Sequence, residues 1–432
     1  MQRFFKDIKS DYCLCFDSDT LRWIIVDKRS ALKCKNSNQD LIKVFEDKKP
    51  NEKEMKNLKG NTFPNFIGIS ILPTFNCNLQ CIHCFYESKP DENYQMLNKE
   101  YIPLIIDLIN RYNIENVTIG GGEPLTWPHL RNLLTEILEK TNAKIFLLTN
   151  GLLLDKIEDI LTTPRFNVQI SLDAVHENTY QKVRGGNFRK LLKNVAKLKN
   201  AKTDIALSYT LHSYNKDEVI KFIKYSEKIG INFIHFPIIE NYGRAKINQL
   251  IPFREELIDL YQFLVYYSLH YNKVKIYFVE EIKFRLLNQL KRYNCSALYN
   301  QLSLGPDGYL YPCSELINDK FKICHITESE KLRDYIHLFR SQTGFGSPIV
   351  QKICPNCPIK YLCGGGCRAV DLLSGKNYFE AQADSLTCDI FLKSVFTILW
   401  ELANYKLDPK VPINLLYSNK VLKLVKEHEK LD

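Results

Sequence analysis

Between residues 66 and 250 the chain alternates short apolar runs with amphipathic runs, and this alternation constrains the fold more than any other feature. Strands that alternate with helices indicate βαβ units, whose right-handed crossovers build a parallel sheet. The sequence therefore predicts an α/β fold, a whole or partial barrel with its chemistry at the C-terminal ends of the strands. The expected strands are residues 66–72, 116–120, 144–149, 167–172, 204–211 and 231–238, and the expected helices are residues 101–112, 129–140, 156–161, 188–199 and 218–230.

The regions on either side of this array define the expected domain organisation. A chain of 432 residues is too long for one ordinary domain. Before the array, two alternating runs and one helical run predict a small N-terminal α+β unit; after it, a Tyr-rich helical segment leads into a cysteine-rich region punctuated by Gly and Pro. The expected domains are residues 1–62 for the N-terminal unit, 63–285 for the barrel, 286–400 for the cysteine-rich region and 401–432 for a helical tail.

The composition removes several classes of protein. With 45% apolar and 25% charged residues, the chain is expected to be globular. It has no run of about 18 or more apolar residues and no apolar segment that resembles a secretory signal, so we expect no membrane span and a cytoplasmic location. The 59 basic and 49 acidic residues are interspersed, which does not indicate a nucleic-acid partner. Fourteen cysteines in a reducing compartment indicate metal or redox chemistry instead.

Three of these cysteines follow the first expected strand in the segment NCNLQCIHCFYE. Cys77, Cys81 and Cys84 form a C-x3-C-x2-C arrangement, so that three thiolates on one loop can converge on a common centre. A structural zinc needs four protein ligands, whereas three leave one position open for another ligand. Half of a zinc ribbon, or three buried thiols, is the alternative interpretation.

A glycine-rich turn, Gly120-Gly121-Gly122-Glu123-Pro124, ends the second expected strand. Together with the cysteine triplet and the six βα units, this turn resembles the radical S-adenosylmethionine (radical SAM) superfamily, over residues 66 to about 250. The resemblance implies a partial (β/α)6 TIM barrel in which the three cysteines hold a [4Fe–4S] cluster and S-adenosylmethionine chelates the fourth iron. Reductive cleavage of the sulfonium would then release a 5′-deoxyadenosyl radical.

The same resemblance implies a set of cofactor contacts. His83 would pack on adenine, the GGGEP turn with Glu123 would hold the methionine ammonium, and Arg184 would pair with the carboxylate. Other interpretations stay open: His83 as a buried histidine, the segment around Asn150 as a plain turn, and Ser171 and Arg184 in capping or surface roles. The expected cofactor-binding residues are His83, Tyr86, Gly121, Gly122, Glu123, Asn150, Ser171 and Arg184.

Seven cysteines near the C-terminus follow the order C-x(9–15)-G-x4-C, C-x2-C-x5-C-x3-C, C, with Gly308 at the glycine position. This order resembles the SPASM extension of radical SAM enzymes, which implies two auxiliary [4Fe–4S] clusters and three clusters in all. A pair of zinc sites is the alternative. By position, the first auxiliary cluster would be held by Cys295, Cys313 and Cys367, and the second by Cys354, Cys357, Cys363 and Cys388.

Two full clusters ask for eight ligands, and seven cysteines match the pattern. The first auxiliary cluster therefore has either an open iron, at which a soft substrate thiolate can bind, or a ligand from elsewhere. Cys324 is a candidate for that ligand, with a buried thiol as the alternative. Glu240, Tyr242 and Arg244 leave the sixth expected strand toward the barrel mouth, where they line the substrate channel or take surface and capping roles.

The resemblance implies a precursor peptide or protein as substrate and a low-potential electron donor such as flavodoxin or ferredoxin. The run from Cys84 to Ser88 and the N-terminal unit are most similar to maturases of ribosomally made peptides, including thioether formers, so residues 1–62 are a candidate leader-binding unit. The alternatives are an anaerobic sulfatase-maturing enzyme that forms formylglycine, a haem-pathway SPASM enzyme, and a metal-binding scaffold without activity. The catalytic acid or base is not identified by the sequence.

Overall fold

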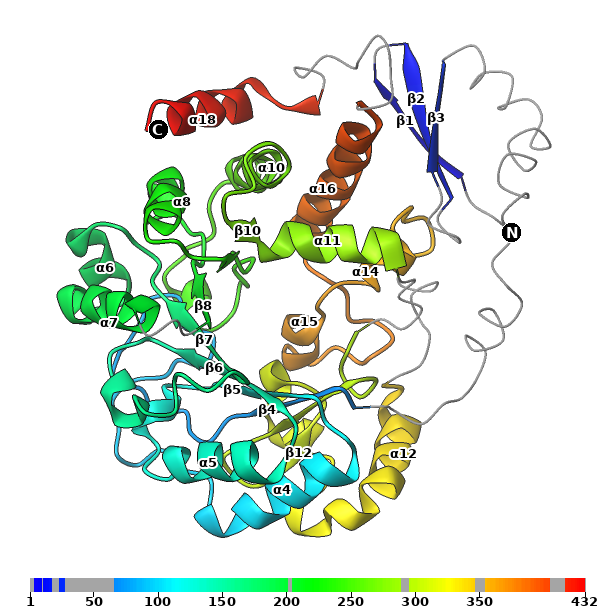
Figure 1. Ribbon diagram of the computed structural model, residues 1–432. Coiled ribbons are helices and arrows are strands. Elements are labelled where there is room, and N and C mark those ends of the chain that lie inside the picture. The colour runs from blue at the N-terminus through cyan, green and yellow to red at the C-terminus, as the bar shows by residue number, and fades with distance from the viewer. Residues whose placement is uncertain are drawn as a thin grey trace.

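The strands of the described residues form two β-sheets. The computed structural model describes residues 4–9, 11–17, 23–27, 66–200, 204–288, 295–345, 354–404 and 416–431. The larger sheet has nine strands in the order β10-β9-β8-β7-β6-β5-β4-β11-β12, and the smaller has three in the order β1-β2-β3. Figure 1 shows the large sheet at the centre and the small one beside helix α16.

The large sheet contains all six strands that the sequence predicts. Strands β4 to β9 pair in parallel in chain order, β10 continues the sheet beyond β9, and β11 adds in parallel to the free edge of β4. Only β12 runs antiparallel to its neighbour among these paired strands. The strands are β4 Gly68–Ile71, β5 Asn116–Ile119, β6 Lys144–Thr149, β7 Phe166–Ser171, β8 Asp204–Ser208, β9 Phe233–His235, β10 Lys275–Ile276, β11 Gln301–Leu304 and β12 Leu310–Tyr311.

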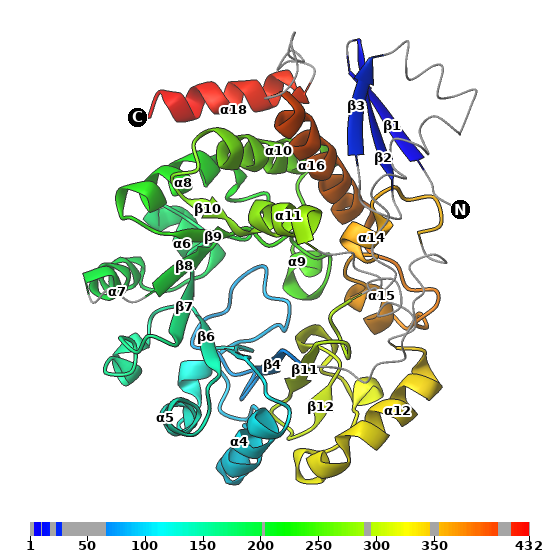
Figure 2. The same cartoon turned by 45° about the vertical axis from the view of Figure 1, so that its right-hand side comes forward.

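Side-chain alternation along these strands separates a core from a cavity. Ile69 lies opposite Val117, which lies opposite Ile145, and all three are buried in the hydrophobic core. Their neighbours in sequence point to the other face, where Ser70 and Thr118 line a cavity. The period of two thus places a small, polar wall inside the curved sheet, while helices cover its outer face (Figure 2).

The helices follow the predicted pattern with one exception. Residues 156–161 were expected to form a helix, but the structure has a 3-10 helix, Leu154–Ile157, followed by turns. The segment is short and Pro164 disfavours helical backbone just before it. The α-helices are α4 Ile102–Arg111, α5 Leu130–Lys140, α6 Glu177–Val183, α7 Phe188–Asn200, α8 Val219–Lys228, α9 Gly243–Ile247, α10 Arg254–His270, α11 Tyr277–Asn288, α12 Leu332–Thr343, α14 Lys360–Cys363, α15 Ala369–Leu373, α16 Ser385–Asn404 and α18 Asn419–Glu429.

The N-terminal sheet is antiparallel, and its strands are β1 Phe4–Lys9, β2 Tyr12–Asp17 and β3 Trp23–Asp27. The sequence predicted β2 and β3 but not β1. The predicted helix of this unit lies outside the described residues. Phe16 on the central strand packs edge-to-face against Phe396 of α16, with 6.0 Å between ring centroids, so the two ends of the chain share one core.

The cysteine-rich region is joined to the barrel through the sheet itself. Strand β11 pairs with β4, and the β11-β12 hairpin leads directly into Cys313. Helix α16 then returns to pack on α10. Of the helices described, none is both long enough and apolar enough to cross a bilayer.

Candidate active site

A cavity of about 390 Å³ lies at the C-terminal ends of the barrel strands. Its wall contains the residues that follow β4, β5 and β6, together with Ser171 at the end of β7 and Thr210 after β8. The volume is within the range of pockets that hold small ligands. Of the expected cofactor-binding residues, the wall contains His83, Tyr86, Gly121, Gly122, Asn150, Ser171 and Arg184.

The predicted cysteine triplet lies on the loop after β4 and lines this cavity. Cys77 and Cys81 are 8% and 9% exposed, and Cys84 is partly buried. Burial, followed by the neighbouring charges that include Cys81 and Cys84, raises the pKa of the Cys77 thiol to about 12. Among the described residues no three Cys, His, Asp or Glu side chains converge on a single ion. A cubane binds each thiolate to a different iron, so its ligands stand further apart.

The GGGEP turn is packed against the cysteine loop, and glycine is required there. Gly121 has φ +109°, and a Cβ on it would stand 2.6 Å from the carbonyl oxygen of Thr74. A Cβ on Gly122 would stand 2.2 Å from the carbonyl oxygen of Asn76. The Gly122 amide donates to Thr74 O at 3.0 Å, and the next amide donates to Asn76 O at 2.8 Å. The turn therefore fixes the start of the loop by direct backbone contact.

Glu123 is 1% exposed and lies behind the cavity wall. Its carboxylate accepts hydrogen bonds from the Thr149 hydroxyl at 2.8 Å, the Asn150 amide at 2.8 Å and the Leu125 amide at 3.2 Å. Burial raises the pKa of Glu123. In this arrangement the side chain ties the end of β5 to the end of β6, and its contact with a ligand ammonium stays a prediction.

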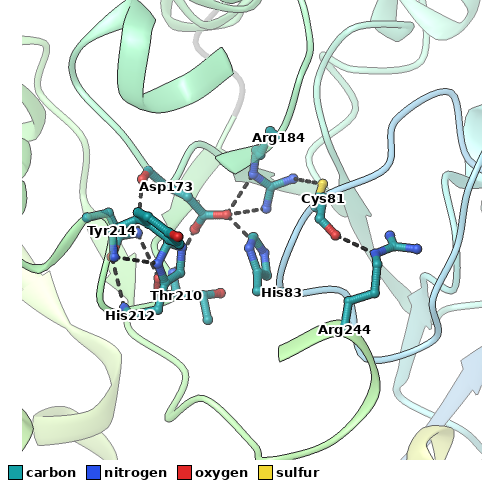
Figure 3. A network of polar contacts seen from close by, with 9 residues as sticks. Cys81, His83, Asp173, Arg184, Thr210, His212, Tyr214 and Arg244 are labelled. Carbon is teal, nitrogen blue, oxygen red and sulfur yellow. Dashed lines mark hydrogen bonds and ion pairs between the residues drawn. The ribbon is translucent and has the colours of Figure 1, made fainter. Parts of the chain in front are cut away.

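Arg184 is buried and forms an ion pair with a carboxylate of the protein. Its Nε donates to Asp173 Oδ2 at 2.6 Å, and its Nη1 lies 3.7 Å from Cys81 Sγ (Figure 3). His83 Nε2 lies 3.3 Å from the same Asp173 oxygen. Burial alone would raise the pKa of Asp173, but the charge of Arg184 and the hydrogen bond from the Thr210 amide act against burial, and the pKa is lowered. Asp173 thus connects two predicted cofactor contacts to the cysteine loop.

Two histidines meet in this network. Burial lowers the pKa of His83 to about 3 and that of His212 to about 4, so both rings are neutral at pH 7. Their centroids are 5.4 Å apart. His83 Nδ1 and His212 Nε2 are buried and lack a hydrogen-bond partner among the described residues. Of the two residues, His83 lines the cavity, and its unpaired Nδ1 fits a polar ligand such as a nucleoside, because a hydrogen-bonding group of that ligand would satisfy it.

Arg244 holds the cysteine loop from the other side. Its Nε donates to Cys81 O at 2.7 Å and its Nη2 donates to Ser88 O at 2.6 Å. Gly243 before it has φ +54°, and a Cβ there would stand 2.4 Å from the carbonyl oxygen of Phe85. Cys81 therefore lies between two arginines, Arg184 at its sulfur and Arg244 at its carbonyl (Figure 3).

The other two residues of this segment lie near the same wall. The Tyr242 ring is 4.7 Å from the Phe85 ring. Glu240 is half-buried, and burial, with Glu315 and Asp384 nearby, raises its pKa to about 7. The proposed role of Glu240, Tyr242 and Arg244 in a substrate channel stays a prediction.

Tyr86 connects the triplet to the cysteine-rich region. Its hydroxyl donates to the carbonyl of Ser314 at 3.3 Å, and Ser314 lines the cavity directly after Cys313. Burial raises the pKa of Tyr86 far above its ordinary value. The cavity wall thus reaches from the first cysteine loop to the residue beside Cys313.

The seven C-terminal cysteines lie in the two groups that the SPASM resemblance implies. Cys295 and Cys367 are among the ionisable groups that raise the pKa of Cys313, after burial and Glu315. Burial, then Cys363, Cys354 and Cys357, raises the pKa of Cys388 to about 12. The loop Gly364-Gly365-Gly366, with all three φ values positive, separates Cys363 of one group from Cys367 of the other. The structure brings each set of thiols together, and their role as cluster ligands stays a prediction.

Cys324 does not belong to either group. It is 4% exposed in the hydrophobic core, and its charged neighbour is Glu328. It affects the pKa of Tyr112 and of Tyr335, whereas the thiols that affect Cys313 are Cys295 and Cys367. The position of Cys324 therefore fits a buried thiol.

Sequence reasoning missed Asp173 as a functional residue and gave Arg244 only a channel role. Asp173 ends the motif Ser171-Leu172-Asp173 at the end of a strand, where an acidic residue is a signal for a site. Its positive φ of +54° is uncommon for a residue other than glycine. Arg244 follows a Tyr-Gly pair whose backbone conformation only the structure shows.

Comparisons with known proteins agree with this geometry. Residues 71–226 match the model of the radical SAM superfamily. The chain contains a radical SAM domain. It is 25% identical over 275 residues to a probable GTP 3′,8-cyclase of Methanococcus vannielii, which covers 62% of this chain and 91% of that protein. A second probable GTP 3′,8-cyclase, from Methanococcus maripaludis, is 24% identical over 57% of this chain and 83% of that protein. The chain is therefore an enzyme with a radical SAM domain, and this domain implies one [4Fe–4S] cluster and S-adenosylmethionine.

Solved structures share the fold of this chain over more than its radical SAM domain. Streptococcus suis SuiB bound to S-adenosylmethionine aligns with a TM-score of 0.57 and 16% identity, over 89% of this chain and 98% of SuiB. The structure of anSMEcpe with bound AdoMet and Cp18Cys peptide aligns with a TM-score of 0.62 and 21% identity, over 79% of this chain and 100% of that chain. These similarities confirm the α/β fold with a partial barrel.

Proposed function

We propose that this radical SAM enzyme is a peptide maturase, which abstracts a hydrogen atom from a residue of a ribosomally made precursor peptide and forms a thioether or another crosslink. One observation carries the proposal. The cavity that holds the cysteine triplet extends to Ser314, beside the group of Cys295, Cys313 and Cys367. A substrate at the barrel mouth would therefore contact both thiol groups.

The residues of the cavity fit the groups that the domain implies. Three mutually close thiols, and a wall that continues with glycine backbone, suit a cluster with one open iron and a small ligand on it. When bound, this cluster and S-adenosylmethionine would supply the radical chemistry. Cys77, Cys81 and Cys84 would hold the cluster, Gly121 and Gly122 would approach the methionyl group, and His83 with its unpaired Nδ1 would face the nucleoside.

Arg184 and Asp173 would orient the ligand through charge. The Arg184 guanidinium keeps donor groups beyond the two that bind Asp173, so it can pair with a carboxylate without losing its ion pair. Ser171 lines the wall nearby, at the end of β7. In a closed cavity these contacts would exclude water from the reacting C–H bond.

The C-terminal region supports assignment to the SPASM type with two auxiliary clusters, because its seven thiols form the two expected groups. The N-terminal sheet supports a peptide substrate, since its outer strands β1 and β3 are candidates for strand addition by a leader. Among the similar structures, one is SuiB bound to the precursor peptide SuiA. A low-potential flavodoxin or ferredoxin in the cytoplasm would be the electron donor.

A nucleotide substrate is the second candidate, because the sequence relatives are probable GTP 3′,8-cyclases. A formylglycine-forming or haem-pathway enzyme would use the same fold. An experiment separates a peptide substrate from a nucleotide substrate: reconstituted protein is incubated with S-adenosylmethionine, a reductant and either GTP or the short Cys-containing peptide encoded nearest to the gene. We expect 5′-deoxyadenosine formation to rise with the peptide only, and deuterium from labelled peptide to appear in it. Stimulation by GTP alone would contradict the proposal.

The leader-binding part of the proposal has its own test. Deleting residues 1–62 should leave S-adenosylmethionine cleavage measurable while turnover of a leader-bearing peptide collapses. Turnover of the leaderless core peptide should change little, because a leader acts by raising the local concentration of the core. Equal processing of the full precursor by the truncated and the full chain would reduce the N-terminal sheet to a structural role.

A further inference from the structure

The group of Cys295, Cys313 and Cys367 contains three thiols, whereas a cubane cluster has four irons. This step rests on the proposed function, in which these thiols hold the first auxiliary cluster. Cys324, the remaining cysteine candidate, is buried in the core beside Glu328, whereas the thiols that affect Cys313 are Cys295 and Cys367. We propose that the carboxylate of Glu315 is the fourth protein ligand of this cluster.

Glu315 is placed for this role by its position in the chain. It follows Cys313 by two residues in a short 3-10 helix, Ser314–Leu316, which begins at Cys313 as its N-cap. The helix turns the Glu315 side chain back toward the thiol group. The Cys367 thiol donates a hydrogen bond to Glu315 Oε2, with 3.6 Å between sulfur and oxygen. The carboxylate therefore already contacts one of the three thiols.

The electrostatic surroundings agree with the geometry. Among the charged groups near Cys313 and near Cys367, Glu315 has the strongest influence on each thiol. A second carboxylate, Glu240, also influences Cys367, but more weakly and from the segment after β9. Glu240 is thus a matched control: the same functional group in the same neighbourhood, without the sulfur contact that Glu315 makes.

A carboxylate ligand has a chemical consequence for this iron. Oxygen is a harder ligand than thiolate sulfur, so an added soft ligand would compete at this iron more readily than at the three held by cysteine. With Glu315 in place, an exogenous thiol must displace the carboxylate. Without it, the iron is open and the thiol binds more tightly.

The test uses the full chain with Cys77→Ala, Cys81→Ala and Cys84→Ala, which removes the first cluster and leaves the auxiliary ones. Anaerobically reconstituted protein is titrated with 2-mercaptoethanol and followed by EPR in the reduced state, with iron and sulfide counted for each sample. We expect Glu315→Gln to bind the thiol at least about tenfold more tightly and to change the EPR signal before thiol is added. Glu240→Gln should behave as the parent.

Each result decides between the proposals. Loss of about four irons in Glu315→Gln but not in Glu240→Gln, with unchanged helical content by circular dichroism, would also support a ligand role. Identical EPR spectra and thiol affinities in the parent and Glu315→Gln, with about eight irons in both, would overturn the Glu315 assignment and leave the SPASM assignment standing. A parent with no iron or sulfide would overturn both.

Discussion

The two cysteine regions of the molecule are built in different ways. On the loop after β4, Cys77 and Cys81 are buried, whereas Cys295, Cys367 and Cys388 in the C-terminal region are exposed. The first loop is held at its backbone by the GGGEP turn and by Arg244. In the C-terminal region, Cys363 and Cys367 flank a run of three glycines with positive φ, between the end of α14 and the start of α15.

The difference indicates which site exists before metal binds. A loop fixed by hydrogen bonds from three separate segments keeps its shape without a cluster, because the protein has already paid the ordering entropy. Exposed thiols on glycine-rich turns gain order only when metal binds, so metal affinity and local folding are coupled there. We therefore predict that the first cysteine loop keeps its shape without a cluster and that, under the proposed SPASM assignment, the C-terminal sites depend on their clusters for structure.

The largest expected effect comes from removing one thiol in each region. Cys84→Ala should abolish reductive cleavage of S-adenosylmethionine, because the first cluster alone binds the cofactor. Cys388→Ala should retain some cleavage that is uncoupled from product. The measurement is the amount of 5′-deoxyadenosine formed per chain under anaerobic reducing conditions. The iron content should be about twelve atoms per chain in the wild type and about eight when all three cysteines of the triplet are replaced. Cleavage by Cys84→Ala at the wild-type rate would refute the assignment of the first site.

Metal removal should separate the two regions directly. In chelated protein, amide hydrogen exchange across residues 354–388 should accelerate at least about tenfold, because the thiol groups lose the metal that orders them. Exchange across residues 74–89 should change much less. Mass spectrometry of peptides from the reconstituted and the chelated protein gives both values. Equal acceleration in the two regions would show that the first loop also depends on its cluster.

Two arginines provide a matched pair for stability. Arg244→Ala removes two charge-assisted hydrogen bonds to the carbonyls of Cys81 and Ser88, and we expect it to lower the free energy of unfolding by about 2–4 kcal/mol. Arg254 makes its ion pair with Asp389, beside Cys388, at the surface. Arg254→Ala should cost less than about 1 kcal/mol. Denaturant titration of each variant gives these values, and equal costs would contradict the proposed difference between the regions.

The last effect is a pH dependence of stability that comes from a buried histidine of the active-site network. His212 is neutral in the folded state because burial lowers its pKa to about 4, below its ordinary value of 6.5. The unfolded chain binds the proton first as pH falls, so stability is lost progressively between pH 6.5 and about 4. At pH 5 the loss from His212 alone should be about 2 kcal/mol relative to pH 7.5.

His212→Asn is the control for this prediction. Asn cannot titrate, and its side-chain oxygen can replace His212 Nδ1, which accepts from the Tyr214 amide at 3.2 Å. The difference in unfolding free energy between pH 7.5 and pH 5 should therefore shrink in the variant. An unchanged pH dependence would show that other groups carry it.

The sequence predicts the barrel because its strands and helices have strong local periodicity. Ile69 and Val117, for example, lie in runs in which apolar side chains alternate between the two faces of the sheet, and both are buried in the core. It also predicts the cysteine triplet and the wall of the cavity, since those residues lie next to strand ends along the chain. These features are predictable because each depends on residues that are close together along the chain, within one βα unit.

The contacts that the sequence does not reveal are those between distant segments. Strand β1 was missed because FFKDIK mixes charged and apolar residues, and the pairing of β11 with β4 leaves no periodic signal in either segment. Asp173 was missed because its importance comes from Arg184 and His83, eleven residues after it and ninety before it. Glu123 was given a ligand role from its motif, while its hydrogen bonds depend on the next strand.

The pairing of β11 with β4 has a consequence for biosynthesis. These strands adjoin in the sheet, but Ile71 and Gln301 are 230 residues apart along the chain (301 − 71 = 230). At about 5–20 residues per second, the ribosome needs roughly 10–50 seconds to make that stretch, so one edge of β4 stays unpaired on the nascent chain for that time. That edge belongs to the strand that carries the cysteine loop, and an unpaired edge is a template for pairing between chains. Yield during expression should therefore depend on elongation rate and on the chaperones that shield this edge until translation passes Leu304.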